Sequence, residues 1–134
     1  MTDHLDTARH LLACMGEKRV DEMLERFADD AVLEFPFAPG AMPRRYDGKT
    51  AAAEFMRGAR DSFSEYTGHP TAVYPVADDL TTVIAEVEGR GVVAENGRTY
   101  DQRYVIVMRF HDDGSLALWR EYFDAGVVVR AFRP

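Results

Sequence analysis

The sequence predicts an α+β fold in which helices cover one face of a curved sheet. In the first third of the 134 residues, apolar side chains repeat every three or four positions, as on one face of a helix. From residue 70 onward they alternate with a period of two, and turn residues separate long stretches. Helices that precede a run of strands predict two layers around one core, and the length fits a single domain over residues 1–134.

Three helices are expected in the first half of the chain. The first has one apolar face and is expected to end at Gly16; that face consists of Leu5, Ala8, Leu12 and Met15. The second is expected at about 20–28, with an inward face of Val20, Met23, Leu24 and Phe27. The third, at roughly 50–63, has a face formed by Ala52, Phe55, Met56, Ala59 and Phe63.

A short strand and a loop are expected between the second and third helices. The apolar segment AVLEFPF predicts a strand at 31–37. The segment at 38–49 holds two prolines and two glycines, so it is expected to be a loop.

The second half predicts four long strands, at 70–77, 80–93, 98–111 and 115–132. Turn signals separate them at Asp78-Asp79, Asn96-Gly97 and Asp112-Asp113-Gly114. Asn-Gly is a strong hairpin signal, and consecutive hairpins build an antiparallel meander. The segment Asp124-Ala125-Gly126 interrupts the last strand, where we expect a bulge or bend.

The pattern of these strands predicts a pocket. Successive side chains of a strand point to opposite faces, and neither face here is purely apolar. A flat sheet with one wet side would alternate more cleanly, so we expect a concave side that holds a pocket. The expected apolar wall is Leu33, Phe35, Phe37, Tyr104, Ile106, Trp119 and Phe123. The expected polar groups are Glu86, Glu88, Arg90, Gln102 and Glu121.

The segment WREYFD at 119–124 places a carboxylate between two large aromatic residues. In a strand, Trp119, Glu121 and Phe123 share one face. A carboxylate walled by apolar groups loses hydration, which disfavours its charged form and raises its pKa. A glutamate whose pKa approaches neutrality is a competent general base or acid.

Three charged residues of the 80–93 strand are expected to join Glu121 in the pocket. Glu86, Glu88 and Arg90 share a strand face. Carboxylates that lie close together push their proton affinities apart, because like charges in one site cannot all ionise cheaply. Arg90 would hold one of them ionised while another stays protonated, which gives an acid and a base in one cavity.

Plainer roles stay open for the same residues. Glu121 would pair with Arg103 or Arg109 if the alternation were shifted by one residue. A bulge at Gly89 would aim the two glutamates of that strand elsewhere. As large residues on a central strand, Trp119 and Phe123 would be ordinary core residues.

Composition and motifs argue against several classes of partner and cofactor. The net charge of −7 and the lack of a basic patch argue against a nucleic-acid partner and against an anionic membrane surface. The single cysteine, Cys14, precludes an internal disulfide, fits a cytoplasmic protein and is expected to be a packed helix residue. The histidines show no metal-ligand spacing and no glycine-rich phosphate loop is visible, so neither metal nor cofactor is expected.

Four segments carry a family resemblance: RFADDAVLEFPFAP at 26–39, PRRYDGKTAAAEFM at 43–56, EVEGRG at 86–91 and DGSLALWREYFD at 113–124. Together they resemble the SnoaL-like branch of the NTF2-like superfamily, which includes ketosteroid isomerases, polyketide cyclases and limonene epoxide hydrolase. The resemblance implies a cone-shaped barrel, with three N-terminal helices on the concave face of a highly curved, mostly antiparallel sheet. It places Met56 on the helix that covers the cavity. It also implies a homodimer, for which the convex side offers Val105, Val107, Leu118 and Tyr122.

The pattern of the epoxide hydrolase is only half present. The resemblance places Glu121 where that enzyme has an aspartate. Of the hydrolase's Arg-x-Asp pair, Glu88 keeps the carboxylate, whereas Glu86 stands at the arginine position. Leu33 and Phe35 stand where the hydrolase holds its attacking water with a tyrosine and an asparagine. We therefore expect a drier pocket, closer to those of the isomerases and cyclases.

The leading functional hypothesis is proton transfer on a hydrophobic, cyclic or polyketide-like small molecule. Glu121 would be the base, and Glu88 or Tyr104 would donate a hydrogen bond to the developing enolate oxygen. Three alternatives stay open: a non-catalytic binding or accessory protein for an apolar metabolite, an epoxide hydrolase with altered water-holding residues, and a purely structural dimerisation domain.

Overall fold

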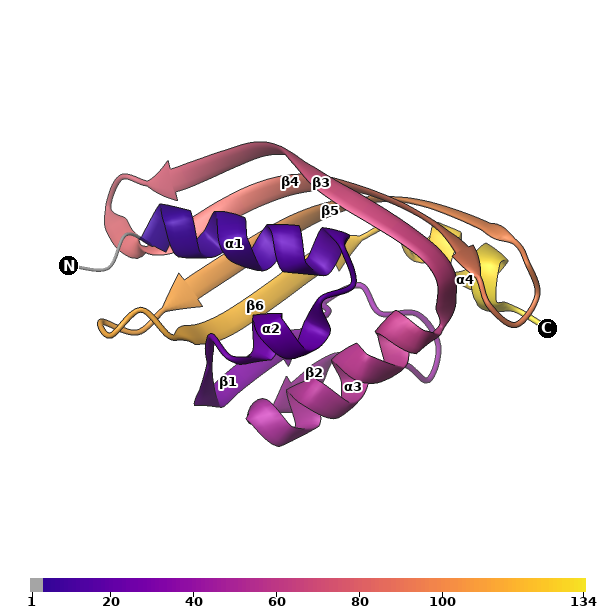
Figure 1. Ribbon diagram of the computed structural model, residues 1–134, viewed down its shortest axis with the longest axis horizontal. Helices are drawn as coiled ribbons and strands as arrows, with labels where there is room; N and C mark the ends of the chain where they lie inside the picture. Colours follow the sequence, from indigo (N-terminus) through magenta and orange to yellow (C-terminus); the bar gives the residue numbers. More distant parts are fainter. Residues whose placement is uncertain (1–3) are drawn as a thin grey trace.

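The computed structural model describes residues 4–134, so the first three residues of the predicted domain lie outside the described part. Figure 1 shows the helices of the first half of the chain on one face of a curved sheet and the C-terminal helix beyond the end of that sheet. The helices are α1 (His4–Gly16), α2 (Val20–Leu24), α3 (Lys49–Asp61) and α4 (Ala125–Phe132). The strands are β1 (Phe27–Glu34), β2 (Arg45–Asp47), β3 (Phe63–Val76), β4 (Asp79–Val93), β5 (Thr99–Phe110) and β6 (Leu116–Phe123).

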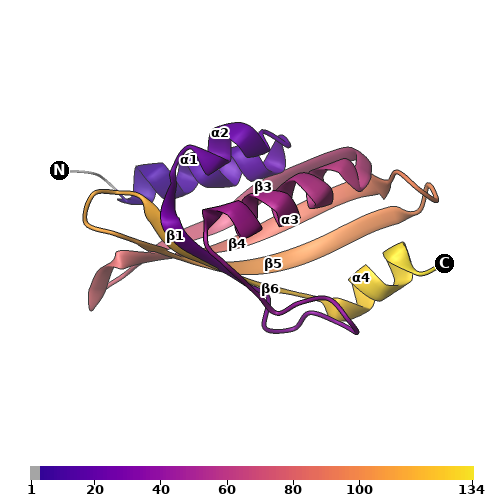
Figure 2. The ribbon, with the colours of Figure 1, turned by 90° about the horizontal axis from the view of Figure 1, so that it is seen from below.

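The strands form one six-stranded sheet in the order β2-β1-β6-β5-β4-β3. All neighbours are antiparallel except β1 and β6, which run parallel. The predicted α+β class, with helices on a curved and mostly antiparallel sheet, is confirmed. The sheet does not close into a barrel, because β2 and β3 are its two free edges; α3 contacts both of them, and Figure 2 shows it above the sheet.

The predicted elements differ from the structure mainly where pairing partners lie far away in sequence. The second helix ends at Leu24 rather than at residue 28, and β1 starts at Phe27, which pairs with Leu116 of β6. The predicted loop at 38–49 contains the short strand β2, whose Tyr46 pairs with Leu33. The first strand of the meander starts at residue 63 rather than at 70, because Phe63 already pairs with Val93 of β4.

The last predicted strand ends early, and a helix replaces its second part. The Asp124 side chain accepts a hydrogen bond from the Gly126 N–H (2.9 Å) and thereby caps α4. The fully buried Gln102 holds the same residue in place: its amide donates to the Asp124 carbonyl oxygen (2.9 Å) and accepts from the Asp124 N–H (2.9 Å). The expected bend at 124–126 is therefore the start of a helix.

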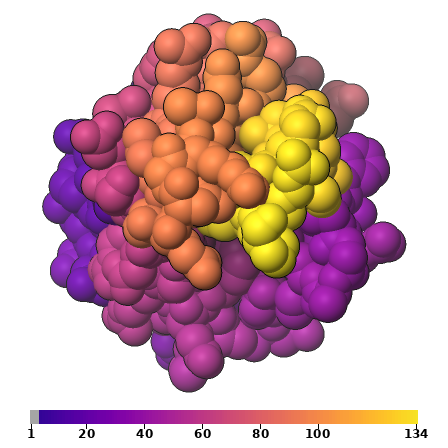
Figure 3. Space-filling view, turned by 90° about the vertical axis from the view of Figure 1, so that its right-hand side faces the viewer, coloured from indigo at the N-terminus to yellow at the C-terminus, as the bar shows by residue number. Residues whose placement is uncertain are grey.

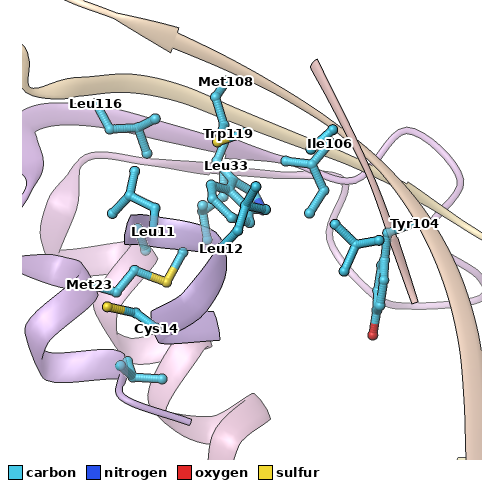
Figure 4. Close-up of a cluster of buried hydrophobic side chains, with 14 of the residues drawn as sticks. Leu11, Leu12, Cys14, Met23, Leu33, Tyr104, Ile106, Met108, Leu116 and Trp119 are labelled. Atoms are coloured by element: carbon cyan, nitrogen blue, oxygen red, sulfur yellow. The ribbon is translucent and has the colours of Figure 1, made fainter. Parts of the chain in front are cut away.

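The core lies between the helices and the concave face of the sheet. Figure 4 shows side chains of α1 and α2 meeting side chains of the sheet; among the labelled residues, Leu11, Leu12, Met23, Leu33, Met108 and Leu116 are fully buried or nearly so. At its C-terminal end α1 crosses β3 very closely. A Cβ atom on Gly16 would lie 2.0 Å from the Gly68 carbonyl oxygen, so only glycine fits there.

The convex face exposes some apolar side chains. Val105 is 39% exposed and Phe37 is 59% exposed, with its ring 5.4 Å from that of Tyr122. Leu118, expected at the same interface, is already buried within the chain. Pairing of two chains through this face stays a prediction.

Among residues 4–134, each helix is too short or too polar to span a bilayer.

Candidate functional site

A cavity of about 350 Å³ lies between the concave face of the sheet and the helices. This volume is within the range of small-molecule binding sites. In Figure 3, α4 (yellow) and the turn between β4 and β5 (orange) lie over one end of the molecule; Val128 and Phe132 of α4 line the cavity. The wall is mainly apolar. It includes seven of the residues proposed from the sequence: Leu33, Phe35, Met56, Tyr104, Trp119, Glu121 and Phe123.

Glu121 supplies a carboxyl group to this apolar wall. It lies on β6 opposite Ile106 of β5, and its Oε1 accepts a hydrogen bond from the Trp119 indole Nε1–H at 3.2 Å. The alternative pairing with Arg103 is wrong, because that guanidinium lies 2.8 Å from Glu88 on the other face of the sheet. The carboxyl group of Glu121 is therefore held by a neutral donor rather than by a cation.

The pKa of Glu121 is close to neutrality. Burial raises it to about 7, although the hydrogen bond from Trp119 lowers it in part. Both protonation states are therefore populated near neutral pH. A group of this kind accepts and returns a proton with little loss of driving force.

Three tyrosine hydroxyls line the same cavity and form a chain of hydrogen bonds. The Tyr66 hydroxyl donates to that of Tyr104 at 3.1 Å, and the hydroxyls of Tyr104 and Tyr100 are 3.0 Å apart. Figure 4 shows the Tyr104 ring pointing from the sheet toward the side on which the helices lie. Three hydroxyls carry three protons, and the two internal bonds use two of them. One O–H is left to donate to a guest in the cavity.

These tyrosines remain protonated at neutral pH. Burial raises the pKa of all three, that of Tyr100 to about 12, and the nearby negative charge of Glu121 raises each further. The carboxyl group and the hydroxyl chain line the same cavity. The site therefore combines a titrating carboxyl group with permanently protonated donors.

Glycine in β4 makes room for the tyrosine chain. A Cβ atom on Gly89 would lie 2.4 Å from the Tyr66 hydroxyl oxygen and 2.9 Å from the Tyr104 ring. On the same strand, Gly91 pairs with Tyr66 of β3 and with Tyr100 of β5. The rings of the outer strands therefore lean over a central strand that has no side chains at these two positions.

We expect Gly89→Ala to break the hydrogen bonds between the tyrosine hydroxyls while the protein still folds. The added methyl group displaces the Tyr66 hydroxyl, because the contact is far below van der Waals distance. The measurement is a spectroscopic titration of the tyrosines, in which at least one should ionise at lower pH than in the unsubstituted protein. Gly97→Ala is unsuitable as a control because Gly97 has a φ of +71°. Gly58→Ala, in open space on α3, is suitable, and an unchanged titration in Gly89→Ala would contradict the packing argument.

Glu86, Glu88 and Arg90 do not lie in this cavity, so their expected placement is wrong. Over residues 83–90 of β4 the buried residues are Val83, Ala85, Val87 and Gly89, and the charged side chains alternate to the opposite face. Glu86 accepts a hydrogen bond from the Tyr74 hydroxyl at 2.7 Å, Glu88 pairs with Arg103, and Arg90 lies 3.8 Å from Asp101. The pair of carboxylates with an arginine therefore belongs to the convex surface.

Three residues expected at the pocket wall have other positions. Phe37 is exposed on the convex side beside Tyr122. Gln102 shares the concave face with the tyrosines but is used to hold the start of α4. Ile106 is fully buried in the core next to Glu121 and lies outside the cavity lining.

Five polar residues of the cavity were not expected from the sequence, and one of them, Ser62, donates its hydroxyl to the Ala59 carbonyl oxygen at 2.6 Å. Tyr66 lies between the expected third helix and the strand expected at 70–77, and Tyr100 faces inward four residues before Tyr104. Lys18 and Arg60 add positive charge to the wall, where the Lys18 Nζ donates to the Phe63 carbonyl oxygen at 2.7 Å. The signal in the sequence was the pair of tyrosines on one strand face, together with glycines at alternate positions of the neighbouring strand.

Comparisons with known proteins agree with this architecture. A family model described as "SnoaL-like domain" matches residues 8–127. The uncharacterised protein YesE of Bacillus subtilis is 37% identical over 95% of this chain and 85% of its own length. An uncharacterised PhzA/B-like protein of Pseudomonas aeruginosa is 35% identical over 73% of this chain and 67% of its own. The crystal structure of a candidate isomerase from Bacillus subtilis superposes with a TM-score of 0.85 at 35% identity, covering 98% of this chain and 96% of that one.

Proposed function

The chain belongs to the SnoaL-like domain family, and from this membership we propose that it catalyses proton transfer on a hydrophobic small molecule by general acid–base chemistry. The observation that carries the proposal is a carboxyl group of near-neutral pKa in the same apolar cavity as a chain of tyrosine hydroxyls. The substrate class is a carbonyl compound, cyclic or polyketide-like, and the reaction is of the isomerase or cyclase type.

In this mechanism Glu121 removes a proton from a carbon atom next to the carbonyl group. The electron pair of the broken C–H bond moves into the enolate, and its oxygen accepts the free O–H of the tyrosine chain. In an isomerisation, the protonated Glu121 then returns the proton to another carbon. In a cyclisation, the carbanion attacks a second carbonyl carbon, the π electrons of that carbonyl move to its oxygen, and the protonated Glu121 gives its proton to the resulting alkoxide. Tyr104 is the donor to the enolate when Tyr66 and Tyr100 both donate to its hydroxyl, because the Tyr104 O–H is then the one left free.

The apolar wall supports this reaction over epoxide hydrolysis. Leu33 and Phe35 line the cavity at the positions where the hydrolase holds its attacking water. Neither side chain has a polar atom that would hold a water molecule. A dry cavity favours a raised carboxyl pKa and strengthens the hydrogen bond to an enolate. The name of the candidate isomerase from Bacillus subtilis agrees with this choice.

The direct test is solvent deuterium exchange at carbon. Apolar cyclic ketones, such as substituted cyclohexenones and tetralones, are incubated with the protein in deuterated buffer and analysed by mass spectrometry. Binding is followed separately through the fluorescence of Trp119, the single tryptophan of the chain, whose indole contacts Glu121. Exchange at the carbon next to the carbonyl supports the proposal. Saturable binding across the ketone panel without any exchange would favour the non-catalytic binding protein instead.

We expect Tyr104→Phe to slow this exchange by roughly 10²-fold, the usual loss when one donor to an oxyanion is removed. Binding measured by Trp119 fluorescence should change much less, because the ring that forms the wall is kept. Tyr74→Phe is the matched control, since it removes a hydroxyl that bonds Glu86 on the convex face. Equal exchange rates in the two variants would remove the tyrosine chain from the mechanism.

A further inference from the structure

A second group of reactive side chains lies outside the cavity, where α1 meets α2. His10 and Cys14 are one turn apart on α1, and Glu22 reaches them from α2. Cys14 is fully buried, whereas the side chains of His10 and Glu22 are about one-third and two-fifths exposed. The three side chains therefore converge from two helices on a point that solvent can reach.

The spacing of these atoms matches one face of a tetrahedron around a metal ion. The Cys14 Sγ lies 3.6 Å from the His10 Nε2 and 3.4 Å from the Glu22 Oε2. The third edge, between the His10 Nε2 and the Glu22 Oε2, is 3.5 Å. Tetrahedral Zn²⁺ with bonds of about 2.0–2.3 Å to oxygen, nitrogen and sulfur places its ligands about 3.3–3.7 Å apart. We propose that His10, Cys14 and Glu22 bind a Zn²⁺ ion that joins α1 to α2.

The donor set selects for this metal. Thiolate, imidazole and carboxylate together suit Zn²⁺, whereas Mg²⁺ and Ca²⁺ require oxygen ligands. Three protein ligands leave the fourth position to water on the exposed side. Binding releases the Cys14 thiol proton to solvent and uses the neutral imidazole of His10, so charge and protons balance. Without metal, burial and then the hydrogen bond to Glu22 raise the pKa of Cys14 to about 11, so the sulfur is not a free nucleophile.

Arg19 competes with the ion for the same carboxylate. Its guanidinium contacts the Glu22 Oε2 and also pairs with Glu17 at 2.8 Å. A bound cation would lie next to this positive charge, which weakens its affinity. Removing the charge should therefore tighten metal binding, and Arg19→Gln becomes a gain-of-affinity test.

The site lies close to the cavity but does not depend on the proposed catalysis. Met15, Val20 and Met23 of the same two helices line the cavity wall. An ion that links α1 to α2 would stabilise this part of the wall. Metal that binds the folded chain and not the unfolded chain raises Tm, and this readout is independent of any reaction at Glu121.

The test uses the full chain, reduced and stripped of metal with a chelator. Co²⁺ is added first, and a thiolate-to-cobalt charge-transfer absorption is expected at one ion per chain. Zn²⁺ should then displace the cobalt, abolish the absorption and raise Tm. Cys14→Ala should eliminate the absorption. His10→Gln and Glu22→Gln should weaken Zn²⁺ binding by at least the roughly tenfold that the loss of an outer-shell partner costs.

Matched control variants distinguish Zn²⁺ binding at this site from nonspecific Zn²⁺ binding elsewhere on the surface. Glu17→Gln removes a carboxylate that also contacts Arg19 but not Cys14, and His69→Gln removes an exposed imidazole of β3. Both should bind Zn²⁺ as the unsubstituted chain does, and Arg19→Gln should bind it more tightly. No charge-transfer absorption, or equal Zn²⁺ affinity in Glu22→Gln and Glu17→Gln, would overturn the proposal. Because His10 and Glu22 are partly exposed, their variants keep the test valid even if Cys14→Ala folds poorly.

Discussion

Replacing Glu121 with glutamine is expected to slow deuterium exchange into a ketone probe by roughly 10²- to 10⁴-fold, the contribution of a positioned general base. The amide has nearly the same shape, and its oxygen still accepts the hydrogen bond from the Trp119 indole. Binding of the probe, followed by Trp119 fluorescence, should therefore be almost unchanged. In the unsubstituted protein, the rate should rise with pH through a midpoint near 7, where the carboxyl group loses its proton.

The same substitution is expected to stabilise the protein above neutral pH. The pKa of Glu121 is raised from 4.5 to about 7 in the folded chain. Between these values the folded chain keeps a proton that the unfolded chain has lost, so the free energy of unfolding falls as pH rises through this window and stays lower above it. Glutamine does not titrate, so Glu121→Gln avoids this fall in the free energy of unfolding. At pH 8, Glu121→Gln should be more stable by about 1–3 kcal/mol in denaturant unfolding.

A lower exchange rate together with a higher stability in Glu121→Gln would show that burial of this carboxyl group costs stability and serves the reaction. Glu88→Gln is the matched control, because Glu88 lies on the convex face, outside the cavity, and pairs with Arg103. It should leave the exchange rate unchanged and bring no gain in stability at pH 8. An exchange rate for Glu121→Gln equal to that of the unsubstituted protein would exclude Glu121 as the base.

Gly16→Ala is expected to destabilise the fold by about 3 kcal/mol or more, at the upper end of the range for overpacking. The new Cβ atom would lie 2.0 Å from the carbonyl oxygen of Gly68. This oxygen belongs to the backbone of β3, so it cannot move aside as the end of a flexible side chain can. Helix α1 must therefore shift away from β3, which opens the core and the cavity wall. Thermal unfolding should show a Tm lower by roughly 10 °C.

The identical substitution at Gly58 is expected to have the opposite sign. Gly58 lies within α3, and a Cβ atom there meets nothing within 4 Å. Alanine in an exposed helix interior is better than glycine by up to about 1 kcal/mol. Gly58→Ala should therefore raise the free energy of unfolding slightly. A similar small effect of both substitutions would show that α1 and β3 are not as closely packed as described.

The fold class could be predicted from the sequence because helical and strand periods are local properties. The change from a spacing of three or four residues to a spacing of two placed helices before strands, and the hairpin signals gave the meander of β3 to β6. The parallel pairing of β1 with β6 and the short β2 could not be predicted, because these contacts join distant segments. Helix α4 was not predicted, because its three consecutive valines favour a strand. In the structure, the Asp124 side chain caps the helix and the Gln102 side chain binds the Asp124 backbone, and both stabilise the start of α4.

The candidate site divides in the same way. Alternation along one strand placed Glu121 correctly between Trp119 and Phe123, because it needs no knowledge of other strands. Alternation along a strand does not show which face of β4 points inward. The face expected to point inward was the charged one, with Glu86, Glu88 and Arg90, whereas in the structure the glycine face points inward and receives tyrosine rings from β3 and β5.

The metal-type cluster shows the same limit. His10 and Cys14 are four residues apart on one helix, a spacing that the sequence analysis passed over, and Glu22 joins them only through the packing of α2 on α1. Along a chain, the sequence determined the period of each element and the direction of each side chain relative to its neighbours. Only the tertiary structure decided what each face meets, because that depends on the shapes and charges that pack opposite it.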